Sequence, residues 1–231
     1  MSGARRSRAE LIQGLFVSCQ ALPGSPLRDP VFMTAMARAA VLGGAKGVRA
    51  NGFDDIQAIR AAVDVPIIGI RKTDNRGPDQ VYITPTLETA VEVARAGADI
   101  IAIDGTSRPR PGGGTLARLI QQIHEQCGLP VMADVDTLAA GMAAREAGAD
   151  LVATTLSGYT TETAASRSDG PDTDLAARLV TDLDCPIVAE GRYSTAGQLQ
   201  EAMSLGVAAV VIGTAITNPT AITRGFAQAY G

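Results

Sequence analysis

The chain has 231 residues, a net charge of −4, and 46% hydrophobic against 19% charged residues. This composition is typical of a globular protein and excludes a largely disordered one, and the lack of a basic excess argues against nucleic-acid binding. The chain has one histidine, His124, so chemistry that needs two histidines, as in most zinc enzymes, is excluded.

Targeting and redox signals point to the cytoplasm. Cys19, Cys127 and Cys185 show no C-x-x-C spacing, which favours reduced thiols. No apolar run approaches the roughly 18 residues that a membrane helix needs. Residues 1–10 lack the apolar core of a signal peptide, and we expect them to form a flexible N-terminal extension.

Two repeated phrases predict the strands. In one, a glycine closes an Ala-rich helical stretch and leads into a β-branched run, as at 97–101, which is typical of a helix end followed by a strand. In the other, a proline precedes the strand, as at 65–68, where no ladder donor is needed. Together with the run at 15–19, these phrases predict strands near residues 15–20, 47–50, 67–72, 100–105, 131–135, 151–157, 187–190 and 209–213.

Stretches with helical spacing, such as 87–96 and 138–147, lie between these strands. The strands are apolar throughout, as expected when both faces of a parallel sheet are buried. Eight such units in one chain predict a single-domain (β/α)8 TIM barrel over residues 1–231. A doubly wound sheet is the alternative, and it requires a reversal of strand order that a sequence does not reveal.

In a barrel, the strand ends and the loops that follow them form one shared mouth, where active sites lie. Any one polar residue there can be a solvated loop residue, but many at one mouth favour a functional site. The main candidates are Gln20, Arg49, Lys72, Asp104, Asp134, Thr155, Ser157, Glu190, Arg192 and Thr214. The single histidine follows the fourth strand in a helical stretch, so we expect it on the outer ring, away from the mouth.

Lys72 and Glu190 are the candidate catalytic pair. A partly desolvated lysine has a lowered pKa and can act as a base or form a Schiff base; a solvated pairing with Asp74 is the alternative. A carboxyl at an apolar strand end has a raised pKa and can act as an acid; an ion pair with Arg192 is the alternative. The third and seventh strands lie across the barrel, which suits proton transfer on opposite faces of one carbon.

The loops after the last two strands are the common phosphate site of barrels. Gly191 with Arg192, and Gly213 with Thr214, occupy these loops. Glycine lets backbone N–H groups approach an anion, and an arginine adds a charge-assisted contact. Asn218 then precedes Pro219, which is typical of an N-cap that opens a helix.

Six ordered phrases carry a resemblance to a known family. They are VSCQA at 17–21, GVRANG at 47–52, VYITPT at 81–86, DIIAIDGT at 99–106, TTLSGYT at 154–160 and VAEG at 188–191. Together they resemble the N-acetylmannosamine-6-phosphate 2-epimerase family of sialic acid breakdown, from about Gly14 to Ile222.

The resemblance implies a (β/α)8 barrel that interconverts N-acetyl-D-mannosamine 6-phosphate and N-acetyl-D-glucosamine 6-phosphate without a metal or organic cofactor. It also implies roles for individual residues. These are Lys72 and Glu190 as catalytic residues, Gln20, Arg49 and Asp134 at the substrate, and Gly191, Arg192, Gly213 and Thr214 at the phosphate. Thr155 and Ser157, at the end of the sixth strand, are further candidates for substrate binding. Asn218 stands where the family phrase has arginine.

Two other functions stay open from the residues alone. One is a sugar-phosphate lyase that uses Lys72 as a Schiff base. The other is a non-catalytic barrel that binds a phosphosugar. The expected partners are a small amino-sugar phosphate and a second copy in a homodimer, with no nucleic acid and no membrane.

Overall fold

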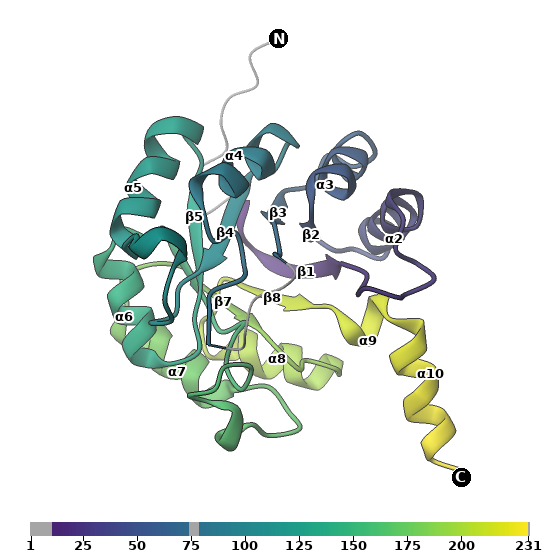
Figure 1. Cartoon of the computed structure of the whole chain (residues 1–231). Helices are drawn as coiled ribbons and strands as arrows, with labels where there is room; N and C mark the ends of the chain where they lie inside the picture. The colour runs from purple at the N-terminus through teal and green to yellow at the C-terminus, as the bar shows by residue number, and fades with distance from the viewer. Residues whose placement is uncertain (1–10, 74–78, 231) are drawn as a thin grey trace.

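The computed structural model describes residues 11–73 and 79–230. Parallel strands close into a barrel in the order β1 to β8, and β1 is hydrogen-bonded to both β2 and β8 (Figure 1). The strands are Gly14–Cys19 (β1), Gly47–Asn51 (β2), Ile67–Ile70 (β3), Ile100–Asp104 (β4), Val131–Asp134 (β5), Leu151–Ala153 (β6), Ile187–Glu190 (β7) and Ala209–Ile212 (β8). The closed order confirms the TIM barrel and excludes the doubly wound alternative, whose sheet is open. The extension predicted for residues 1–10 lies outside the described residues.

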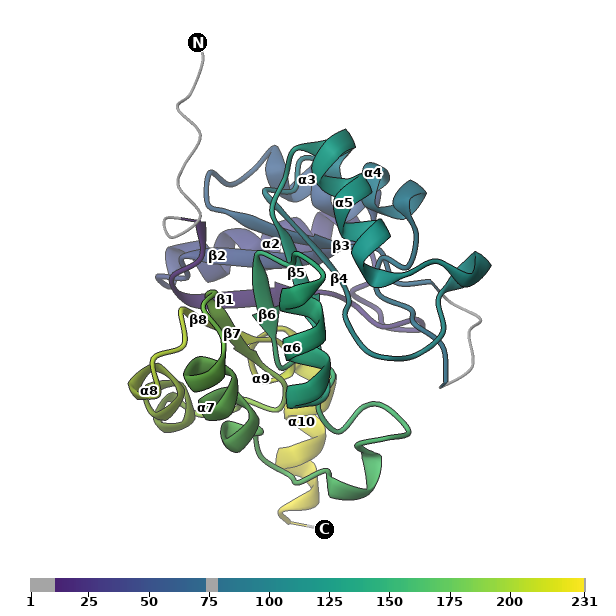
Figure 2. The same ribbon diagram turned by 90° about the vertical axis from the view of Figure 1, so that its left-hand side faces the viewer.

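Each strand after β1 is preceded by a helix on the outside of the barrel (Figures 1 and 2). These helices are Pro30–Leu42 (α2), Phe53–Arg60 (α3), Leu87–Arg95 (α4), Leu116–Cys127 (α5), Leu138–Glu146 (α6), Thr173–Asp182 (α7) and Ala196–Ser204 (α8). Single 3-10 turns occur at Pro111–Gly113 and Ala164–Ser166. After β8 come α9, Thr214–Thr217, and α10, Pro219–Gln228, which projects away from the barrel (Figures 1 and 2).

The repeated phrases have the predicted conformations. The glycines of the repeated phrase that follow α2, α4, α6 and α8 all have positive φ; they are Gly44, Gly97, Gly148 and Gly206, and φ of Gly97 is +102°. The prolines stand directly before β3, β5 and β7. Their carbonyls accept hydrogen bonds from neighbouring strands, as Pro130 does from Ile101 at 3.0 Å. A proline there therefore loses no ladder bond, because only its oxygen is used.

Two apolar layers hold the barrel together. Strand residues that point outward, such as Val48 and Ala133, pack against the helices, whereas Phe16, Met132 and Val211 fill the interior. Gly47 makes room for the Phe16 ring, since a Cβ at that position would lie 2.0 Å from it. Inward and outward positions alternate along each strand because the side-chain period of a strand is two.

Two predicted strands, the third and the sixth, are longer than the observed ones by two residues or more. β3 ends at Ile70, and Lys72 instead forms a single antiparallel bridge with Ile83. β6 ends at Ala153, because residues 154–160 fold into turns. In one of these turns the Ser157 N–H donates to the Thr154 carbonyl at 3.1 Å. Both differences arise at the mouth, where contacts with other segments replace the pairing of neighbouring strands.

His124 lies on α5 as predicted. Its Nε2 is 2.7 Å from a carboxylate oxygen of Asp150, which also accepts the N–H of Val131 at the start of β5. The histidine therefore belongs to the end of the barrel opposite the mouth. None of the helices within residues 11–73 and 79–230 is long and apolar enough to cross a membrane.

Candidate active site

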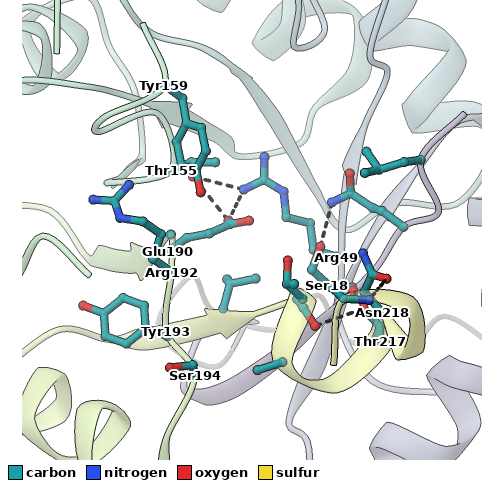
Figure 3. Close-up of a pocket in the computed structure, with 18 of the residues that line it drawn as sticks. Ser18, Arg49, Thr155, Tyr159, Glu190, Arg192, Tyr193, Ser194, Thr217 and Asn218 are labelled. Carbon is teal, nitrogen blue, oxygen red and sulfur yellow. Dashed lines mark hydrogen bonds and ion pairs between the residues drawn. The ribbon is translucent and has the colours of Figure 1, made fainter. Parts of the chain in front are cut away.

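A cavity of about 650 Å³ opens at the carboxyl ends of the strands. Side chains from several strands and their following loops line it, among them Ser18, Gln20, Arg49, Lys72, Tyr82, Thr155, Glu190 and Asn218. It is thus the shared mouth that the strand order predicts. Figure 3 shows Arg49 reaching toward Thr155 and Glu190, with Thr217 and Asn218 on the other side of the pocket.

Arg49 is the centre of a buried charge cluster and is 1% exposed. Its guanidinium donates to both carboxylate oxygens of Asp134, at 2.5 and 3.2 Å, and its Nη1 also contacts a carboxylate oxygen of Glu190. Thr155 joins the cluster, because its hydroxyl donates to Asp134 at 2.6 Å and lies 3.2 Å from Glu190. One guanidinium therefore faces two carboxylates.

The alternation of side chains along each strand explains why Arg49, Asp134 and Glu190 meet. In β2, β5 and β7 the neighbours Ala50, Ala133 and Ala189 face the helices. Arg49, Asp134 and Glu190 consequently point into the barrel, since alternate residues of a strand face opposite sides. The sequence predicts all three as mouth residues, and the structure brings them together.

Lys72, which follows β3, lies close enough to this charge cluster for its charges to act on the lysine. Its backbone N–H donates to the side-chain oxygen of Asn51, 2.8 Å away, and its bridge to Ile83 fixes the segment. Burial is the main cause that lowers the pKa of Lys72, and the charge of Arg49 lowers it further. Glu190 and Asp134 oppose that shift without reversing it. The alternative partner, Asp74, lies outside the described residues.

The carboxyl of Glu190 has a raised pKa, chiefly because it is buried, although its contact with Arg49 opposes the shift. The like charge of Asp134 adds to the increase. The alternative ion pair with Arg192 is absent from the described residues, and Glu190 is paired with Arg49 instead. Since β3 and β7 are four strands apart in the closed order, Lys72 and Glu190 project from opposite sides of the mouth.

The predicted substrate residues differ in position. Gln20 and Thr155 line the cavity, and the Oε1 of Gln20 is buried without a partner in the described chain. Asp134 is fully buried behind Arg49 and does not line the cavity. Ser157 is also outside the lining, because its hydroxyl donates to Asp172 at 2.5 Å. Asp134 therefore acts on the cavity only through its neighbours.

The predicted phosphate residues all line the cavity. Gly191 and Arg192 have φ of +114° and +60°, which turns the chain sharply after β7. The Arg192 guanidinium donates to the carbonyls of Gly170, at 2.6 Å, and Ser157, at 2.7 Å. Asn218 caps α10, as predicted, by accepting the N–H of Ala221 at 3.0 Å.

Tyr82, Arg167 and Asp169 are among the lining residues that were not predicted. Tyr82 reaches the mouth because the antiparallel segment beside Lys72 is anchored on Asp104, whose carboxylate accepts the Tyr82 N–H at 3.2 Å. Asp104 itself is fully buried and paired with Arg108, so it supports the mouth from behind. The VYITPT phrase was the only signal for Tyr82, and nothing in the sequence marked the other two.

Comparison with known proteins agrees with this geometry. Residues 33–231 match the model of the N-acetylmannosamine-6-phosphate epimerase family. The chain belongs to this family. A relative from Cutibacterium acnes with the name N-acetylmannosamine-6-phosphate 2-epimerase is 48% identical over 99% of both chains. Another relative with that name, from Thermosynechococcus vestitus, is 51% identical over 88% of this chain and 87% of its own.

Solved structures support the same family at the level of the fold. The N-acetylmannosamine-6-phosphate 2-epimerase from Clostridium perfringens superposes with a TM-score of 0.93 and 38% identity over 99% of both chains. A thiamine phosphate pyrophosphorylase from Pyrococcus furiosus has a TM-score of 0.60 at 16% identity, which shows a shared fold alone. The epimerase family predicted from the sequence phrases is therefore confirmed.

Proposed function

We propose that the protein interconverts N-acetyl-D-mannosamine 6-phosphate and N-acetyl-D-glucosamine 6-phosphate by moving the proton at C2. The observation that carries this proposal is the placement of Lys72 and Glu190 on opposite sides of one cavity. Inversion at carbon needs a group that removes a proton on one face and a group that supplies one on the other. The epimerisation in the family's name is such an inversion.

The charges around the cavity suit the transfer of a proton between Lys72 and Glu190. Arg49 contributes one positive charge, and Asp134 and Glu190 contribute two negative charges when ionised. Adding protonated Lys72 makes the four groups neutral, and so does neutral Lys72 with protonated Glu190. These two states differ only in the position of one proton. Each is the starting state for one direction of the reaction.

The chemistry begins with the open-chain sugar, because the C2 proton is acidic only beside the C1 carbonyl. Neutral Lys72 removes that proton on one face, which gives an enolate and a lysine cation. Protonated Glu190 then delivers its proton to C2 from the other face, and the carboxylate that remains faces Arg49. The reverse reaction exchanges the two roles, and a proton returns from Lys72 to Glu190 to complete the cycle.

The other predicted residues hold the substrate in this account. Gln20 has an unused acceptor oxygen at the cavity, which can accept an N–H or hydroxyl of the sugar. Arg49 and Thr155 orient Glu190, and Arg49 offers positive charge to the developing enolate oxygen. Gly191, Arg192, Gly213 and Thr214 lie in the loops after β7 and β8 and receive the phosphate. Ser157 contributes indirectly, since its carbonyl holds Arg192.

Substitution of the lysine tests the assignment. The chain contains two lysines, Lys46 and Lys72, and Lys46 is exposed just before β2, at the opposite end of the barrel. Lys72→Ala is expected to bind the sugar phosphate yet lose at least about a thousandfold in kcat, within the range of a lost general base. Lys46→Ala should leave kcat unchanged. Substantial epimerisation by Lys72→Ala would disprove the role of this lysine.

The lyase alternative is separated by trapping. A Schiff base on Lys72 would be reduced by borohydride to a stable adduct, which peptide mass mapping distinguishes from any adduct on Lys46. The epimerase account expects no adduct and no cleavage of a carbon–carbon bond. Binding of N-acetylmannosamine 6-phosphate without any turnover would instead support the non-catalytic alternative.

The setting of the enzyme is also part of the proposal. We infer a role in sialic acid and N-acetylmannosamine breakdown, a cytoplasmic location and one barrel domain over the whole chain. A homodimer is the proposed assembly. Sedimentation of the purified protein tests this last point, and a monomer at micromolar concentration would contradict it.

A further inference from the structure

Two arginines stack against one tyrosine at the edge of the cavity. The guanidinium carbons of Arg167 and Arg192 lie 4.7 and 5.4 Å from the centre of the Tyr159 ring. All three residues line the cavity. They belong to the segment between β6 and α7 and to the turn after β7. Figure 3 shows Tyr159 and Arg192 beside Glu190 at one side of the pocket.

Gly158 allows this close packing. It has a φ of +79°, and a Cβ there would lie 3.0 Å from both the Arg167 side chain and Nη1 of Arg192. The backbone thus brings two positive side chains together, although like charges at short distance repel each other. Such an arrangement gains its stability from a counter-charge.

The described residues do not supply that counter-charge. Neither guanidinium forms an ion pair within residues 11–73 and 79–230, and Arg192 is held by two backbone carbonyls. Arg167 is exposed, and its guanidinium has no hydrogen-bond partner in this part of the chain. The acidic residues of the same segment are Glu162, which lines a separate pocket, Asp169, which lines the cavity, and Asp172, which accepts from Ser157 and caps α7.

We propose that Arg167 is a specificity-determining residue that binds the phosphate of the substrate from the segment after β6, alongside Arg192. The ligand class is a phosphate monoester dianion. This inference rests on the proposed function for the identity of the sugar, but the phosphate contact itself is independent of the reaction. Tyr159 positions the arginine, because a cation over an aromatic face is attracted to it.

Kinetics with N-acetylmannosamine 6-phosphate test the inference. Arg167→Ala is expected to raise KM by about tenfold and to leave kcat within about twofold, because the lost charge-assisted contact is far from C2. Arg167→Lys should recover part of the affinity, since it restores the charge without the planar fork. Arg95→Ala removes an exposed arginine of the last turn of α4, and as the matched control it should change neither constant.

Binding measurements separate this inference from the proposed function. By calorimetry, the Kd of inorganic phosphate should rise by the same factor in Arg167→Ala, whereas unphosphorylated N-acetylmannosamine should bind both proteins equally. An unchanged KM and phosphate Kd, or an equal loss for the unphosphorylated sugar, would overturn the role of Arg167. If the wild-type protein binds phosphate but never turns over the sugar phosphate, the epimerase proposal is refuted. The role of Arg167 in phosphate binding is then tested by the phosphate Kd alone.

Discussion

Arg49 neutralises the buried carboxylates of the site, so its loss is expected to destabilise the fold. In Arg49→Met an apolar side chain replaces a guanidinium that is 1% exposed, and Asp134, at 0% exposure, loses its ion pair. Removing one partner of a buried pair costs about 3–5 kcal/mol, because the other charge stays buried. In a chain of this size each kcal/mol shifts Tm by roughly 2–4 °C, which gives a fall of about 6–20 °C.

Urea unfolding at neutral pH measures this loss, with Arg95→Met as a control that should stay within about 0.5 kcal/mol of the wild type. The loss should also depend on pH. Burial already raises the pKa of Glu190 in the folded protein, and without the opposing charge of Arg49 that pKa lies further above its unfolded value. The deficit therefore grows as pH rises from the ordinary carboxyl range through the folded-state pKa, and it is complete above that. A loss below about 1 kcal/mol at neutral pH would refute the buried, charged cluster.

Three further predictions concern the site and the core. The pH profile of kcat/KM should be bell-shaped in both directions, because burial lowers the pKa of Lys72 and raises that of Glu190; a profile with one limb would argue against a two-group exchange. Gly47→Ala should lose about 1–3 kcal/mol in urea titration, since its Cβ would lie 2.0 Å from the Phe16 ring; an unchanged midpoint would show that the ring moves aside freely. The thiol of Cys19 should react far more slowly with a disulfide reagent than that of Cys185, because Cys19 is fully buried and its pKa is raised to about 12; equal labelling would contradict its burial.

The barrel itself could be predicted because its signals are local. Each glycine after a helix and each proline before a strand acts on its own backbone, so the repeats at 97–101 and 65–68 mark their elements without tertiary information. The ends of β3 and β6 could not be placed in this way. Whether Lys72 continues a strand depends on its pairing with Ile83, and the sequence does not show that this later segment returns to the mouth.

The residues of the candidate site could be predicted where they lie at the end of a predicted strand. Arg49, Lys72 and Glu190 follow from their positions at the ends of apolar strands, and the structure brings them to one cavity. The depth of Asp134 behind Arg49 was not predictable, because it depends on which side chain occupies the middle of the barrel. Arg167 could not be found either, since its place at the cavity depends on the turns of residues 154–160.

Exchange of the C2 hydrogen tests the central claim most directly. The protein would be incubated with N-acetyl-D-mannosamine 6-phosphate in D2O, and both epimers would be followed by proton NMR. The account predicts that N-acetyl-D-glucosamine 6-phosphate appears with deuterium at C2 and with every carbon–carbon bond intact. Absence of the second epimer, or a product formed by carbon–carbon cleavage, would contradict it.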